Sequence, residues 1–281
     1  MIPAQFDYAV AGSVDEAIAM LAENEDNKLL AGGHSLLPLM KTRLARPAKL
    51  IDIGRIDALR GVSRDGDHLV IGAMTTQADL ATDALVREHC AIVAIAAEQV
   101  GDPQVRHMGT LGGSLAHADP ASDQPTVMLA LDAEMVARGP GGERRIPAAE
   151  FFQGFFASAL APDELLTAIR VPVTDGAGAA YLKFTQRALD WAIVGVAAVV
   201  RSSGGTVQDA RIALTNMGTV PVRASAAEAA LAGASGDAIA AACARAGEGT
   251  DPPSDTFAGA DYRVHLAGVL TERAVRQAMG G

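Results

Sequence analysis

The sequence predicts an α+β fold whose two parts differ in their pattern of strands and helices. Up to about residue 175, short strand-like runs alternate with amphipathic helices and glycine-rich segments. After Asp175-Gly176-Ala177-Gly178, longer strand-like runs come first and alanine-rich helical segments follow. A run of strands followed by a run of helices is typical of helices packed on one face of an antiparallel sheet. We therefore expect one domain over 1–175 and a second over 176–281.

The first domain begins with a helix and a β-loop-helix-β unit. Ser13 and Glu16 have the spacing of a capping box, and an apolar stripe then predicts a helix over about 14–24. Short apolar runs at 28–31 and 49–53 predict two strands.

The remainder of the first domain is predicted to mix strands with buried helices. A strand is expected at 69–73, followed by a threonine-capped helix to about residue 88 and a largely buried helix at 91–100. Residues 101–125 contain four glycines and three prolines, too irregular for one element, so we expect a long functional or mobile loop. A strand at 163–171 ends the domain.

The second domain is expected to hold a three-stranded antiparallel sheet and helices. The segment 202–206, Ser-Ser-Gly-Gly-Thr, is a hairpin signal between the last two strands. The strands are expected at 181–187, 192–201 and 207–215, and the helices at about 224–232, 236–247 and 261–279.

Composition excludes several classes of function. A chain of 281 residues with 49% hydrophobic residues can bury a substantial core, and its net charge of -10 disfavours nucleic acid as a partner. Cys90 and Cys243 show no CxxC spacing, so we expect two buried thiols and neither an iron–sulfur nor a zinc site. The six histidines form no compact metal-ligand motif, and we assign neither a metal site nor a catalytic residue.

The sequence also bears on location. The N-terminus has no basic segment ahead of an apolar run, so we expect no secretory signal and a cytoplasmic chain. The longest apolar run, 191–200, is too short to span a bilayer and is better interpreted as a buried strand.

Two glycine pairs stand out as candidates for binding a diphosphate. They lie in Ala31-Gly32-Gly33-His34-Ser35 and in Thr110-Leu111-Gly112-Gly113-Ser114. Glycines let backbone N–H groups approach a diphosphate, and the neighbouring hydroxyls can donate further hydrogen bonds. Either pair alone is more typical of an ordinary turn. Neither fits the GxGxxG or the GxxxxGK[ST] fingerprint, so another nucleotide-binding scaffold is needed.

The stretches LLAGGHSLLPLMKTRLARPAKLIDI and GTLGGSLAHADPASDQP resemble the two FAD-diphosphate segments of flavoproteins related to carbon monoxide and xanthine dehydrogenases. The resemblance extends through both domains and is strongest to the medium subunits of the carbon monoxide dehydrogenases. It implies a two-subdomain FAD-binding fold of the PCMH (vanillyl-alcohol oxidase-like) type. The subdomains would cover about 1–55 and 56–175, with FAD between them.

The resemblance also implies which residues lie at the cofactor. Three of them have competing explanations. Asp123 is also a common turn residue, and a lysine in an apolar strand, such as Lys183, usually points to solvent. Trp191, where many relatives have tyrosine, could be a core residue or could cover the flavin. A cation at position 183 would stabilise a reduced anionic flavin. The implied residues are Leu30, Ala31, Gly32, Gly33, His34, Ser35, Leu36, Gly101, Thr110, Gly112, Gly113, Ser114, Asp123, Leu166, Lys183 and Trp191.

By the same resemblance, the chain is an oxidoreductase subunit of a heterotrimer. A small subunit would carry iron–sulfur clusters and a large subunit the molybdopterin cofactor. Electrons would pass from substrate to molybdenum, through the clusters to FAD, and on to quinone, NAD, cytochrome or oxygen. The chain would be free in the cytoplasm or held at the inner face of the membrane through its acceptor. The alternatives are a free-standing flavin oxidase, a heterocycle or aldehyde dehydrogenase subunit of the same family, and a non-enzymatic scaffold.

Overall fold

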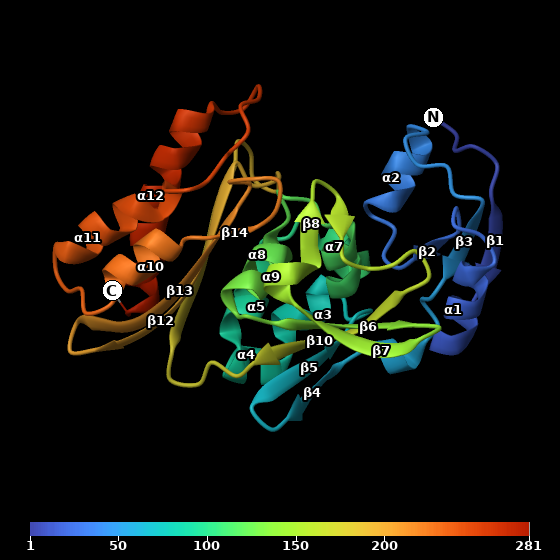
Figure 1. Cartoon of the computed structure of the whole chain (residues 1–281), viewed down its shortest axis with the longest axis horizontal. Coiled ribbons are helices and arrows are strands. Elements are labelled where there is room, and N and C mark those ends of the chain that lie inside the picture. Colours follow the sequence, from blue (N-terminus) through green and yellow to red (C-terminus); the bar gives the residue numbers. More distant parts are fainter. Residues whose placement is uncertain (281) are drawn as a thin grey trace.

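The computed structural model describes residues 1–280, and its N-terminal subdomain is built on a small parallel sheet (Figure 1). The strand order is β1-β3-β2, and both pairs are parallel. Ser13 caps the first helix by accepting the Glu16 N–H at 3.1 Å, but the Glu16 carboxylate accepts from Gly12 instead of closing a true capping box. The elements are β1 (Asp7–Val10), α1 (Val14–Ala22), β2 (Lys28–Leu30), α2 (Leu36–Lys41) and β3 (Lys49–Asp52).

A five-stranded antiparallel sheet forms the second subdomain, in the order β4-β5-β10-β6-β7. Its helices lie on one face of the sheet and fill the middle of the molecule (Figure 1). The elements are η1 (Asp57–Leu59), β4 (Val62–Asp65), β5 (His68–Gly72), α3 (Gln77–Thr82), α4 (Ala84–His89), α5 (Ala91–Glu98), α6 (Pro103–Met108), α7 (Leu111–His117), α8 (Asp123–Ala130), β6 (Glu134–Gly139), β7 (Gly142–Pro147), α9 (Ala148–Phe151), β8 (Phe152–Gly154), β9 (Ala157–Ser158) and β10 (Leu165–Pro172).

Two predictions for this subdomain are wrong. The expected loop at 101–125 contains α6, α7 and the start of α8, because Asp102 and Thr110 cap two short helices by accepting the N–H groups three residues on. The expected single helix to residue 88 is divided at Asp83, which has extended backbone and caps α4. In both places a polar residue caps a new helix, where the sequence predicted a loop or one continuous helix.

The C-terminal sheet has four strands, so the prediction of three is one short. The order is β11-β12-β13-β14, all antiparallel, and β14 is only two residues long, too short for a sequence pattern. The predicted hairpin is present, with Gly204 and Gly205 both at positive φ. The elements are β11 (Gly178–Phe184), β12 (Val194–Ser203), β13 (Thr206–Thr215), β14 (Val222–Arg223), α10 (Ser225–Leu231), α11 (Ala238–Cys243), η2 (Ala244–Gly247) and α12 (Ala260–Ala278).

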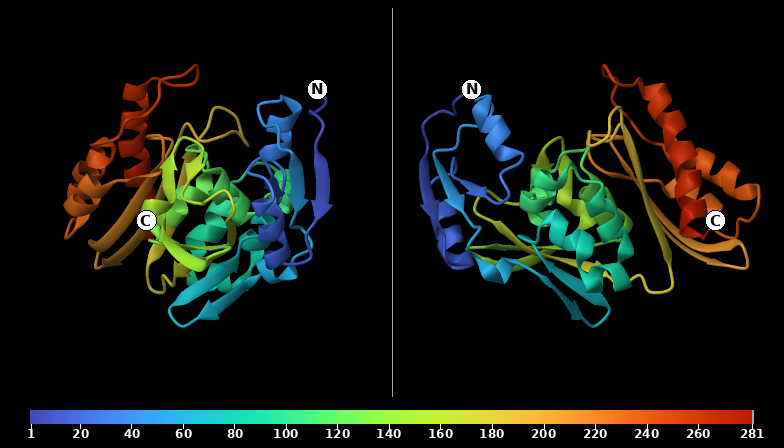
Figure 2. Two further views of the ribbon diagram at one scale, coloured as in Figure 1. Left: turned by 45° about the vertical axis from the view of Figure 1, so that its right-hand side comes forward. Right: turned by 180° about the vertical axis from the view of Figure 1, so that it is seen from behind.

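Both faces of the C-terminal sheet are buried. Tyr181 and Val199 join the core of the central subdomain, together with residues of α5 and α8, whereas Ala180 and Val200 pack beneath α10, α11 and α12. Figure 2 shows this sheet standing between the central helices and α12. The sheet is therefore the wall shared by the two halves of the molecule.

Two further predictions concern the cysteines and membrane-spanning helices. Cys90 and Cys243 are free and buried, as predicted, and burial raises the pKa of each thiol to about 12. Across residues 1–280, every helix is too short or too polar to cross a membrane.

Gly178 is a test of the contact between β11 and α12. A Cβ added there would lie 1.6 Å from the carbonyl oxygen of Ala278, so Gly178→Ala must push strand and helix apart. We expect a loss of about 1–3 kcal/mol or more, seen as a lower urea midpoint by circular dichroism. Gly154→Ala is the matched control because a Cβ there meets no atom within 4 Å. Equal midpoints for the two variants would refute the close contact.

Candidate functional site

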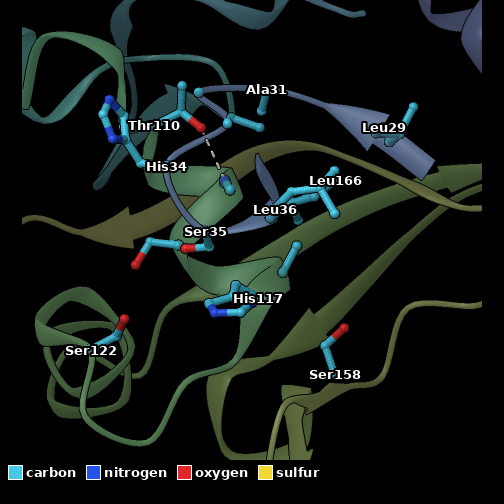
Figure 3. Close-up of a pocket in the computed structure, with 18 of the residues that line it drawn as sticks. Leu29, Ala31, His34, Ser35, Leu36, Thr110, His117, Ser122, Ser158 and Leu166 are labelled. Carbon is cyan, nitrogen blue, oxygen red and sulfur yellow. Dashed lines mark hydrogen bonds between the residues drawn. The ribbon is translucent and has the colours of Figure 1, made fainter. Parts of the chain in front are cut away.

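A cavity of about 870 Å³ lies where the N-terminal subdomain, the central subdomain and the C-terminal sheet meet. Its volume is within the range of sites that enclose a large organic ligand. Residues of the turn after β2, of α7 and of β10 line it (Figure 3). Residues of the β11–β12 connection also line it. Every predicted site residue lines this cavity except Leu30, which lies between the lining residues Leu29 and Ala31.

The two glycine turns, about 80 residues apart in sequence, pack directly against each other. A Cβ on Gly32 would lie 2.1 Å from the carbonyl oxygen of Met108, so only glycine allows this approach. Gly33 has φ of +76°, which turns the chain into α2. A Cβ on Gly113 would lie 3.7 Å from that of Ala31. The turns thus form one continuous wall.

The two turns offer different groups to a ligand. At the start of α7 the amides are already paired inside the protein, and Gly112 N–H donates to the Ala73 carbonyl at 2.8 Å. Gly113 N–H donates to the Thr110 hydroxyl at 3.1 Å, the bond drawn dashed at Thr110 in Figure 3. Gly112 is therefore required for close packing on Ala73, where a Cβ would lie 2.5 Å from the alanine Cβ. Ser35 precedes α2, and its side chain makes no capping bond. Free N–H donors are thus expected mainly at the α2 turn.

A buried ion pair forms another wall of the cavity. Lys183 Nζ lies 3.1 Å from Asp123 Oδ2, and each side chain is only 7% exposed. Lys183 therefore points into the protein, and the expectation that a lysine in an apolar strand faces solvent is wrong here. Lys183 also donates to the Gln99 carbonyl at 2.8 Å, and the Tyr181 hydroxyl donates to Asp123 Oδ1 at 2.7 Å. Burial raises the pKa of Asp123, against the opposing effects of Lys183 and Tyr181.

Trp191 lies at the cavity on the connection between β11 and β12. It is 61% exposed and precedes the first residue of β12, so the alternative that it is a core residue is wrong. Two residues on, the carbonyl of Ile193 accepts a hydrogen bond from Arg263, a buried residue of α12 that also pairs with Asp255 at 2.6 Å. The base of the connection is therefore fixed by the C-terminal helix.

Several lining residues were not predicted, among them His117, Ser122, Ser158 and Glu164. His117 packs against Phe156 with 4.9 Å between ring centroids, and burial lowers the pKa of its imidazole. It follows Ser114 by three residues on α7, so helical periodicity would have placed it at the site if this segment had been interpreted as a helix.

Comparison with known proteins identifies the class first. Residues 4–174 match the family described as the FAD binding domain in molybdopterin dehydrogenase, and residues 179–278 match the carbon monoxide dehydrogenase flavoprotein C-terminal domain. The chain is therefore an FAD-binding flavoprotein of the oxidoreductase class.

The relatives define the family more closely. The carbon monoxide dehydrogenase medium chain of Hydrogenophaga pseudoflava is 43% identical, over 99% of this chain and 98% of the relative. The 6-hydroxypseudooxynicotine dehydrogenase complex subunit alpha of Paenarthrobacter nicotinovorans is 39% identical, over 99% and 96%. A solved structure of the H. pseudoflava dehydrogenase superposes with a TM-score of 0.96 at 45% identity, covering 100% of this chain and 99% of its own. The chain belongs to the medium, FAD-binding subunits of the molybdenum hydroxylases, which confirms the predicted family.

The ion pair gives a test of the cavity wall. Lys183→Met leaves the Asp123 carboxylate buried without its cation, so we expect a loss of about 3–5 kcal/mol at neutral pH. Adding Asp123→Asn removes the orphaned charge and should restore most of that loss. Thermal unfolding of the two single variants and the double variant of the cofactor-free chain measures this coupling. Purely additive losses would contradict a direct pair.

Proposed function

We propose that this chain carries electrons inside a carbon monoxide dehydrogenase-like complex, from iron–sulfur clusters on a partner subunit to an external acceptor. The observation that supports this most directly is the single cavity in which both glycine turns and the Lys183–Asp123 pair meet. The proposal places FAD between residues 1–55 and 56–175, with residues 176–281 as the domain that closes one side.

In this proposal each wall of the cavity has a different task. The turn at 32–36 and the start of α2 would hold the diphosphate through backbone N–H groups, helped by the hydroxyls of Ser35, Thr110 and Ser114. Leu166, Lys183 and Trp191 would lie near the flavin ring. Bound FAD supplies the exchange between one-electron and two-electron transfer, and the chain supplies its orientation and surrounding charge.

The proposed partners are supported by the relatives, which are named a medium chain and a subunit of a dehydrogenase complex. Residues 1–280 contain no group of three or more His, Cys, Asp or Glu side chains placed to hold a metal, and both cysteines are buried singly. The proposed small iron–sulfur and large molybdenum subunits would therefore bring every other redox centre.

The substrate of the complex is a separate part of the proposal. Relatives at 43% and 39% identity are named for carbon monoxide and for a nicotine derivative, so a similar medium subunit serves different chemistry. We favour carbon monoxide because the relative and the superposed structure from H. pseudoflava are both carbon monoxide dehydrogenases. The proposed acceptor is a quinone, NAD, a cytochrome or oxygen.

The proposed function is tested by purifying the chain from its natural source under native conditions. We expect flavin absorbance, two companion subunits, iron and molybdenum in the same fraction, and bleaching of the flavin when carbon monoxide is added. A chain that purifies alone and binds no added FAD would refute the proposal. Bleaching by a nicotine derivative or an aldehyde, with none by carbon monoxide, would change only the substrate.

The single tryptophan provides a direct reporter of FAD binding. We expect FAD to quench the fluorescence of Trp191 in the cofactor-free chain, because the side chain lies at the cavity. Gly32→Ala should raise the dissociation constant at least about tenfold, since its Cβ must displace the neighbouring turn. Gly141→Ala, where a Cβ meets no atom within 4 Å, should leave the constant unchanged. Unquenched fluorescence with FAD bound would place Trp191 away from the flavin.

A further inference from the structure

Tyr181 reaches the cavity wall without lining the cavity. Its side chain is 1% exposed and belongs to the core shared by the two halves of the molecule. Tyr181 and Lys183 are two residues apart on β11, so both project from the same face of the C-terminal sheet. That face packs against α5 and α8 of the central subdomain.

The two residues hold the two oxygens of one carboxylate. The Tyr181 hydroxyl donates to Asp123 Oδ1 at 2.7 Å, while Lys183 lies 3.1 Å from Oδ2. Gln99 bonds to both residues. Its backbone carbonyl accepts from Lys183, and its side-chain amide donates to the backbone carbonyl of Tyr181, each at 2.8 Å. The ammonium and the carboxylate are thus fixed relative to each other.

Neighbouring residues of β12 and β13 also hold the Tyr181 hydroxyl in place. Tyr181 Oη lies 3.2 Å from the Thr215 hydroxyl, which in turn bonds Thr126 at 2.8 Å. A Cβ on Gly195 would lie 2.8 Å from the Tyr181 oxygen, so a side chain at that position would displace it. The phenol is consequently held in one place by β12 and β13, and its donor is directed at Asp123.

The charges that face Asp123 are few. Lys183 and Tyr181 come from β11, and Asp119 from the turn before α8 raises the proton affinity of the carboxylate. The groups that face the network from the other packed elements, Gln99 and Thr215 among them, carry no charge. The charge state of Asp123 therefore depends on burial, on Lys183, on the Tyr181 hydroxyl and, least strongly, on Asp119.

We propose that Tyr181 is a positioning residue that keeps Asp123 ionised and paired with Lys183, and thereby sets the charge that the C-terminal sheet presents to the flavin. The inference rests on the proposed FAD site. Without the hydroxyl, Asp123 Oδ1 loses its donor and the carboxylate takes up a proton more readily. Protonation leaves Lys183 unpaired, so the wall becomes more positive and favours the more negative, reduced flavin.

The experiment compares the full chain, loaded with FAD, as wild type and as Tyr181→Phe. Spectroelectrochemical titration gives the flavin midpoint potential at each pH, and Trp191 quenching gives the FAD dissociation constant. As pH falls, protonation of Asp123 should add a rise to the flavin midpoint potential. In Tyr181→Phe this rise should begin about one pH unit higher than in wild type, because Asp123 has lost one hydrogen bond to its charged form. Thr215→Val is the matched control, since it removes a partner of the hydroxyl but not the donor to Asp123.

A second variant keeps the aromatic ring and the hydroxyl in place, so that its result does not depend on a loss of folding. Replacing Tyr181 with 3,5-difluorotyrosine keeps the ring and strengthens the donor, so the pH dependence should move in the opposite direction. Potentials that match wild type at every pH in both variants, with FAD still bound, would overturn this inference and leave the proposed function intact. Failure of the wild-type chain to bind FAD would instead refute the proposed function itself.

Discussion

The buried contact between Asp123 and Lys183 is the interaction on which the rest of the site depends. Asp123 is the first residue of α8 in the central subdomain, and Lys183 belongs to β11 of the C-terminal sheet. Removing either charge from water is costly, so each is tolerated only while the other is in place. The pair therefore links the position of the C-terminal sheet to the shape of the cavity, and holds the start of α8 beside Gln99 at the end of α5.

Many of the regular elements could be predicted from local patterns, whereas the packing of the cavity walls could not. The helix after Ser13 and the hairpin at Gly204-Gly205 follow from cap and turn chemistry acting over a few residues. The inward orientation of Lys183 depends on Asp123, sixty residues earlier, and strand periodicity does not contain that information. The resemblance to flavoproteins implies that both residues lie at the site, whereas the strand pattern alone favours a lysine that points to solvent.

The glycine pairs illustrate the same limit. The two pairs look like equivalent diphosphate loops in the sequence, yet Gly32 allows two turns to touch and Gly112 allows α7 to pack on Ala73. Short helices at 103–117 were missed because Asp102 and Thr110, as caps, look like loop residues among prolines and glycines. The residue types were informative, but which neighbour each glycine meets is decided by tertiary packing.

The two-sided burial of the C-terminal sheet also bears on how such subunits can be recombined. Residues of β11 and β12 alternate between the core around α5 and α8 and the core beneath α12. An exchange of C-terminal segments between relatives would therefore carry the core beneath α12 along intact, but would change the sheet residues that pack against α5 and α8. A working chimera would have to carry α5 and α8 along with the sheet, so the functional cassette is larger than the segment that follows residue 176.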